Sequence, residues 1–155
     1  MAKIRPIPEG YEAAIPYLCV QNGSEAIDFY RRAFGAVEKY RIDDPSGKVG
    51  HAEIRIGDAV LMLSDEYPEM GVLSPKSIGG SSVAIHIYVE DVDAVAERTV
   101  AAGAKVLRPV EDQFYGDRAG KLEDPFGHTW WLSTRKEEVS VDEMKSRAAK
   151  LFGGG

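Results

Sequence analysis

The sequence repeats a pattern after about 69 residues, and this repeat limits the possible folds more than any other feature. The apolar run at 14–20 precedes a helical pattern at 24–35, and the run at 83–89 precedes a similar pattern at 91–103. Three short extended runs follow in each half. An internal repeat of this kind predicts two copies of one structural unit that share a domain. We therefore expect an α+β fold with two tandem βαβββ modules that form a curved mixed sheet around a cleft.

Local signals set the boundaries of the two modules. Ser24 is a candidate N-cap of the first helix and Gly35 its stop signal, whereas Asp91 and Gly103 bracket the second helix. Within residues 51–56 polar and apolar side chains alternate, which is typical of a half-buried strand. The pair at 57–58 (Gly-Asp) predicts a hairpin turn. The domain at 1–155 then divides into module one at 13–65, a linker at 66–82, module two at 83–135 and a C-terminal helix at 140–152.

Two segments lie outside the repeat. The polar linker contains several Gly and Pro residues, so it is either a lid over a binding site or a flexible connector. The C-terminal helix has Ser140 and Glu143 at capping-box spacing. Its apolar side chains share one face, on which it should dock: Val141, Met144, Ala148 and Leu151. We expect a homodimer with this helix at or near the interface, because exposed sheet edges and an apolar helix face favour association.

Composition and net charge limit the kinds of partner that this protein is expected to bind. The net charge of −6 and the absence of a basic stripe argue against nucleic-acid binding. No apolar run approaches the ~20 residues that cross a bilayer, and the first ten residues contain no secretory signal. The lone Cys19 excludes an internal disulfide and a multi-cysteine zinc site. We expect a cytoplasmic protein whose partners are a small molecule and a second copy of itself, with no nucleic acid and no membrane.

Several motifs resemble one superfamily. The two βαβββ modules, the helix end FYRRAFG at 29–35 and the turn DPFG at 124–127 are similar to the vicinal oxygen chelate superfamily of glyoxalase I, bleomycin and fosfomycin resistance proteins and extradiol dioxygenases. The resemblance covers about residues 13–135. The segments HAEIRIG at 51–57 and 115–131 resemble its branch labelled 3-demethylubiquinone-methyltransferase-like. No glycine-rich methyl-donor site of the Rossmann kind accompanies that label.

The resemblance also implies where a metal would bind. Metal-bearing members of the superfamily carry His or Gln on the first strand of each module and Glu on the last. The corresponding positions in this sequence are Ile15, Met62, Ala84 and Trp131. Hard and borderline divalent ions need oxygen or imidazole donors, which these side chains lack. We therefore expect no metal and no cofactor, unless a different set of ligands binds a divalent ion.

Strand alternation predicts the residues that face the cleft. Side chains with the same parity as the lost metal positions should point into it, and the loop aromatics at 114–115 offer flat surfaces for a ligand. Arg118, with Asp117 in an expected turn, could hold a charged group. The predicted ligand-binding residues are Tyr17, Cys19, His51, Glu53, Arg55, Met62, Ser64, His86, Tyr88, Phe114, Tyr115, Arg118 and Trp131.

Several roles stay open for the reactive side chains. His86 could be a general acid–base, a displaced metal ligand or a structural histidine. His51 and Glu53 could pair, join His86 in an improvised metal set, or form a salt-bridge ladder with Arg55. Cys19 is either a nucleophile or a small buried hydrophobe.

We interpret the chain as a small-molecule-binding protein without the usual metal site, with drug sequestration as one possible role. The alternative is a metal-dependent lyase, isomerase or dioxygenase that acts on vicinal oxygens, and a third reading is a metal-free enzyme that uses His86. The sequence leaves open whether the protein is an enzyme.

Overall fold

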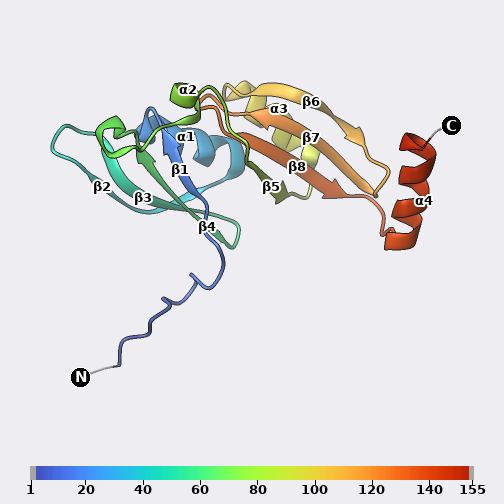
Figure 1. Ribbon diagram of the computed structural model, residues 1–155, viewed down its shortest axis with the longest axis horizontal. Helices are drawn as coiled ribbons and strands as arrows, with labels where there is room; N and C mark the ends of the chain where they lie inside the picture. The colour runs from blue at the N-terminus through green and yellow to red at the C-terminus, as the bar shows by residue number, and fades with distance from the viewer. Residues whose placement is uncertain (1–2, 154–155) are drawn as a thin grey trace. The chain divides into compact units, whose positions relative to one another are not determined.

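The computed structural model describes residues 3–153 and consists of two compact units (Figure 1). Unit 1 ends at Gly80 and unit 2 begins at Ser81, so the boundary lies within the predicted linker. Each unit contains one four-stranded mixed sheet and one long helix that follows the first strand. The predicted α+β fold with two βαβββ modules is confirmed.

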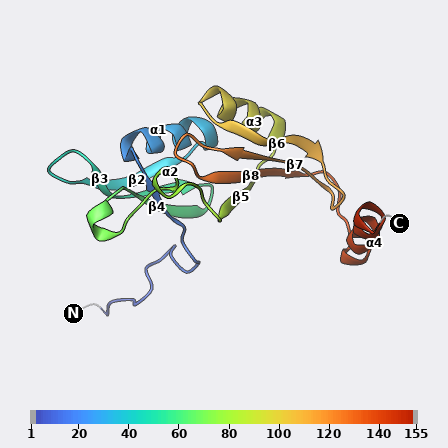
Figure 2. The same ribbon diagram turned by 45° about the horizontal axis from the view of Figure 1, so that its top comes forward.

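Unit 1 places its last strand beside its first. Its strand order is β1-β4-β3-β2, with β1 parallel to β4 and the other pairs antiparallel. Its helix α1 lies over the sheet (Figure 2) and buries Phe29 and Tyr30. The elements of the repeat are β1 (Tyr17–Val20), α1 (Gly23–Phe34), β2 (Val37–Asp43), β3 (Val49–Ile56) and β4 (Ala59–Asp65).

Unit 2 repeats the arrangement with strand order β5-β8-β7-β6. Its first and last strands are again parallel, and α3 contacts β6, β7 and β8. Trp130 and Leu132 of the last strand are fully buried. The elements are β5 (Ala84–Tyr88), α3 (Val92–Ala101), β6 (Lys105–Asp112), β7 (Asp117–Glu123), β8 (Thr129–Arg135) and α4 (Val141–Phe152).

The N-cap of helix α1 lies two residues before the predicted one. Its N-cap is Asn22, whose backbone is extended and whose side chain accepts a hydrogen bond from the Glu25 amide. The predicted cap, Ser24, lies inside the helix, and its hydroxyl accepts a hydrogen bond from Arg41. The predicted stop at Gly35 is confirmed, because this residue adopts the left-handed conformation with φ of 69°.

The segment predicted as a linker has local secondary structure of its own. It contains a short 3-10 helix (Pro68–Met70) and the four-residue helix α2 (Pro75–Ile78). The Glu66 carboxylate accepts a hydrogen bond of 2.6 Å from the Ser74 amide. These local hydrogen bonds satisfy backbone groups that a flexible connector would leave to water.

Helix α4 is capped as predicted, but its apolar face is only partly covered. The Ser140 hydroxyl accepts a hydrogen bond from the Glu143 amide, whereas Val141 and Leu151 are exposed and no residue of the helix is buried. Arg147 attaches this helix to neighbouring segments of unit 2. Its guanidinium donates to the Phe114 carbonyl at 3.0 Å and pairs with Glu137 at 2.6 Å.

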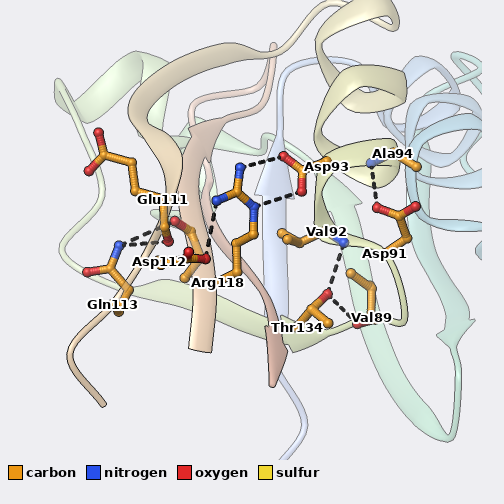
Figure 3. A network of polar contacts seen from close by, with 11 residues as sticks. Val89, Asp91, Val92, Asp93, Ala94, Glu111, Asp112, Gln113, Arg118 and Thr134 are labelled. Atoms are coloured by element: carbon orange, nitrogen blue, oxygen red, sulfur yellow. Dashed lines mark hydrogen bonds and ion pairs between the residues drawn. The ribbon is translucent and has the colours of Figure 1, made fainter. Parts of the chain in front are cut away.

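Side chains at equivalent positions near the ends of β4 and β8 anchor helices α1 and α3. In unit 1 the buried Asp65 carboxylate accepts hydrogen bonds from the Gly23 amide at 3.0 Å and the Val49 amide at 2.7 Å. In unit 2 the Thr134 hydroxyl accepts from the Val92 amide at 2.9 Å (Figure 3). Each side chain thus satisfies an amide in the first turn of a helix, where no intrahelical acceptor exists.

This arrangement predicts that Asp65→Asn destabilises the protein. The amide nitrogen of asparagine would face one of the two buried backbone donors, so one hydrogen bond is replaced by a repulsive contact. We expect the free energy of unfolding in urea at pH 7 to fall by about 2 kcal/mol. Asp58→Asn in the exposed hairpin turn is the control and should change stability little. Equal stabilities for the two variants would contradict this role of Asp65.

Candidate functional site

One face of the unit 1 sheet carries a row of four side chains, one from each strand. The strand registers place Tyr17 beside Met62, Met62 beside Glu53, and Glu53 beside Tyr40. Alternate residues of these strands, such as Leu18, Ile54 and Leu63, are buried in the core. The predicted division of strands β1, β3 and β4 into a core face and a polar face is therefore present in unit 1.

Glu53 is the centre of this polar face and is itself buried, with 3% of its surface exposed. Its Oε1 accepts a hydrogen bond from the Tyr11 hydroxyl, and its Oε2 accepts one from the Tyr40 hydroxyl at 2.6 Å. His51 Nε2 lies 2.9 Å from the same Oε2. Both carboxylate oxygens are thus occupied by donors of the chain. The expected ladder with Arg55 does not form, because Arg55 lies exposed toward the end of β3.

The hydrogen bonds keep Glu53 ionised. Burial alone raises the pKa of its carboxyl, but hydrogen bonds from His51, Tyr11 and Tyr40 outweigh burial and hold the pKa at about 2. The same contact stabilises the protonated Tyr40 phenol, so the Glu53 carboxylate, together with burial, raises the pKa of Tyr40 to about 12.

The Glu53 carboxylate also fixes the state of the His51 ring. An ionised carboxylate only accepts hydrogen bonds, so His51 Nε2 must carry a proton and donate it. In the neutral imidazole Nδ1 is then an acceptor, and the Tyr17 hydroxyl lies 2.7 Å from it. The result is a continuous hydrogen-bonded chain from buried Glu53 through His51 to Tyr17, which is 52% exposed.

In unit 2 the equivalent strand positions carry different side chains. His86 Nε2 lies 2.8 Å from the Ser133 hydroxyl, and its ring stacks on Tyr88 with centroids 5.0 Å apart. The Tyr88 hydroxyl donates to the buried Asp117 carboxylate at 2.7 Å. His86 also lies beside Trp131 in the strand register, and the Lys121 ammonium is 5.7 Å from the Trp131 ring centroid.

A pocket of about 670 Å³ opens beside this group in unit 2. Tyr88 and Tyr115 form its aromatic walls, and Asp117 and Arg135 add charged groups. Arg135 has an exposed ion pair with Glu138 at 3.4 Å, a contact of the kind that contributes little to stability and can be exchanged for a ligand. The segment before α4 and the helix itself complete the lining through Glu137, Glu138, Val139, Ser140 and Met144.

Some predicted ligand-binding residues have other contacts. Asp117 and Arg118 belong to β7, so the predicted turn at these positions is wrong. Arg118 has the opposite parity to Asp117, and its guanidinium binds Asp93 of α3 at 2.8 Å and Asp112 of β6 at 3.2 Å (Figure 3). The buried Ser64 hydroxyl donates to the Asp65 carbonyl.

The Phe114 ring contacts the rings of Tyr115 and Phe152, with centroids 5.2 and 5.9 Å apart, and thereby packs against α4. Its backbone carbonyl is the acceptor for Arg147. Phe114 therefore supports the wall residue Tyr115, and it is not itself part of the pocket lining.

The residues at the metal positions that the resemblance implies do not fit a metal ion. Ile15, Met62, Ala84 and Trp131 offer hydrocarbon, thioether and indole groups, which are poor donors for hard divalent ions. The alternative metal ligands also do not come from a single unit. His51 and Glu53 belong to unit 1, whereas His86 belongs to unit 2. Within either unit, over residues 3–153, no three His, Cys, Asp or Glu side chains form a group that could hold a metal ion.

The sequence analysis missed three members of the unit 1 group. Tyr11 lies before the first strand, and Lys39 and Tyr40 lie on β2, whose alternation is weak because most of its residues are exposed. Lys39 Nζ is 2.8 Å from the Tyr11 hydroxyl and 4.5 Å from the centroid of that ring. No sequence motif indicated Tyr11, because its contact with Glu53 spans 42 residues.

The geometry of each unit agrees with comparisons to known proteins. The family model of the Glyoxalase/Bleomycin resistance protein/Dioxygenase superfamily matches residues 13–132. The chain belongs to this superfamily. An uncharacterized protein of Mycobacterium tuberculosis is 45% identical over 145 residues, which cover 92% of this chain and 85% of that protein.

Solved structures of other proteins share the fold. Protein PA1353 from Pseudomonas aeruginosa has a TM-score of 0.64 and 26% identity, with coverage of 80% of this chain and 98% of that one. A PhnB protein from Bacillus cereus, which carries the 3-demethylubiquinone-9 3-methyltransferase label, has a TM-score of 0.63. It is 18% identical over 79% of this chain and 99% of its own, so this likeness shows the fold alone. The resemblance to the superfamily that the motifs indicated is confirmed by the match of the family model.

The Glu53 contacts predict a specific loss of stability in acid. The pKa of Glu53 is depressed from 4.5 to about 2 in the folded protein, so its stabilising effect is complete above pH 4.5 and is lost as the pH falls toward 2. This difference corresponds to about 3 kcal/mol. Glu53→Gln should therefore remove part of the decline in unfolding free energy between pH 5 and pH 2, measured by urea titration. Asp58→Asn is the control, and a Glu53→Gln profile parallel to wild type would contradict the prediction.

Cys19 should be an unreactive thiol rather than a nucleophile. Burial, with added repulsion from Glu66 and Asp65, raises its pKa to about 11, so the thiol stays protonated at neutral pH. Relative to its ordinary pKa of 9.0, the thiolate fraction falls about 100-fold. Iodoacetamide at pH 7.5 should therefore alkylate Cys19 about 100-fold more slowly in the native protein than in urea. Similar rates in the two states would show that the thiol is activated.

Proposed function

We propose that this protein binds a small organic molecule without a metal ion, in the pocket of unit 2. The observation that carries the proposal is the pocket of about 670 Å³ that is lined by Tyr88, Tyr115, Asp117 and Arg135. This volume lies within the range of ligand sites, and such sites combine aromatic walls with a few charged groups.

The lining suits a ligand that has an aromatic part and an anionic group. The Tyr88 ring is 64% exposed and is held in place by its hydrogen bond to Asp117, so it offers a fixed surface for stacking. Arg135 can exchange its exposed partner Glu138 for a carboxylate of the ligand, because the guanidinium forms paired hydrogen bonds with such groups.

The absence of metal chemistry is part of the proposal. At the four metal positions of the superfamily the chain carries no oxygen or imidazole donor. The one buried carboxylate on the unit 1 face, Glu53, already accepts three hydrogen bonds from the chain. Binding without chemistry is what a drug-sequestering protein requires, and sequestration, the homodimer and the cytoplasmic location remain predictions.

Ligand screening tests the proposal. Thermal shift and ligand-observed NMR with aromatic carboxylates, aromatic antibiotics, catechols, 2-oxoaldehydes and acyl-CoA thioesters should identify at least one class that raises the melting temperature. A ligand at 100 times its Kd stabilises the folded state by about 2.7 kcal/mol. We expect Tyr88→Ala and Arg135→Ala to weaken binding of that ligand about tenfold or more.

Two controls distinguish metal-free ligand binding from the function of a metal-dependent lyase, isomerase or dioxygenase. Val106→Ala, at an exposed position on β6 outside the pocket lining, should leave the affinity unchanged. Treatment with EDTA should also leave binding unchanged. Stoichiometric metal in protein purified without chelator, together with binding that EDTA abolishes, would overturn the proposal in favour of the metal-dependent enzyme.

A further inference from the structure

Five of the seven tyrosines have hydroxyl groups with side-chain partners of two kinds. Tyr11 and Tyr40 donate to Glu53, Tyr67 donates to Asp44, and Tyr88 donates to Asp117. Tyr17 differs, because its hydroxyl lies 2.7 Å from the Nδ1 atom of His51. The ring of Tyr17 is 52% exposed, so a molecule in solution can reach this hydroxyl.

The two partners have opposite effects on reactivity. A carboxylate that accepts a hydrogen bond stabilises the neutral phenol, and it raises the pKa of both Tyr40 and Tyr67 to about 12. A neutral imidazole can instead take the phenol proton as the oxygen attacks an electrophile. Glu53 then stabilises the imidazolium through its contact with Nε2 at 2.9 Å. A nucleophile, a base within hydrogen-bond reach and a third group that orients the base are the parts of an activated nucleophile.

The surroundings of His51 keep this arrangement fixed. Tyr11 and Tyr40 hold the Glu53 carboxylate from two other segments, so Glu53 cannot turn away from the ring. Lys39 adds a positive charge to this group, because its ammonium donates to the Tyr11 hydroxyl. The rings of Tyr17 and Tyr40 flank the His51 ring, with centroids 5.5 and 5.8 Å from it.

We propose that Tyr17, His51 and Glu53 form a nucleophilic triad in unit 1 that reacts with small activated acyl compounds. Tyr17 Oη forms a bond to the carbonyl carbon of an ester, and its proton passes to His51 Nδ1. The bond between the carbonyl carbon and the leaving oxygen breaks, and the alcohol departs with the proton from His51. The product is an acyl ester of Tyr17. Tyr17 is the catalytic residue, His51 the general base and Glu53 a positioning residue.

This activity is separate from the ligand pocket. All three residues belong to unit 1, whereas the residues that line the pocket belong to unit 2. Loss of one function therefore leaves the other measurable in the same preparation.

Acetylation of the full-length protein by p-nitrophenyl acetate at pH 7.5 tests the triad. Mass spectrometry of peptides locates the acetyl group, and p-nitrophenolate release gives the rate. We expect Tyr17 to be acetylated at least about tenfold faster than Tyr40 and Tyr88, which are similarly exposed but bound to carboxylates. His51→Gln should slow Tyr17 acetylation by about tenfold or more.

Three further variants distinguish the triad from simpler explanations. Tyr17→Phe should abolish the fast release of p-nitrophenolate, whereas release that persists would identify His51 as the nucleophile and overturn the proposal. His128→Gln, which alters a histidine outside both sites, should leave Tyr17 acetylation unchanged. Glu53→Gln, where the variant folds, should slow the acetylation of Tyr17. If this variant does not fold, the results for Tyr17→Phe and His51→Gln decide the proposal. Equal acetylation of Tyr17, Tyr40 and Tyr88 would also refute the triad.

Discussion

The parallel pairing of the first and last strands within each unit is the constraint on which the other features depend. It places Tyr17 beside Met62 in unit 1 and His86 beside Trp131 in unit 2. Once this register is set, alternation sends one set of side chains to the helix and the other to the opposite face. A shift of one residue would exchange the two sets, so the buried apolar residues fix the polar face as firmly as they fix the core.

The polar face of unit 1 is organised around one buried charge. A buried carboxylate is costly unless hydrogen bonds replace its water, and Glu53 receives them from Tyr11, Tyr40 and His51. These contacts occupy the oxygens that a metal would need, and they orient the His51 ring toward Tyr17. The same interactions therefore argue against metal binding at Glu53 and in favour of proton transfer through His51.

The two units share a topology but differ in the chemistry at equivalent positions. Tyr17 of β1 corresponds to His86 of β5, and the helix anchor Asp65 corresponds to Thr134. Unit 2 has the pocket, whereas the exposed hydroxyl that contacts an imidazole lies in unit 1. Repetition of a fold thus provided two similar sheet faces, and substitution of a few side chains on each gave them separate properties.

The sequence by itself determined the repeat, the βαβββ order and the division of most strands into two faces. These features depend on local periodicity and on turn residues, which neighbouring positions specify. Tertiary structure decided the contacts between distant residues. Tyr11 reaches Glu53 across 42 positions, and Arg118 binds Asp93 of α3 because it lies in β7 rather than in a turn. The pairing of strands that are far apart in the chain selects such partners, and no local pattern encodes them.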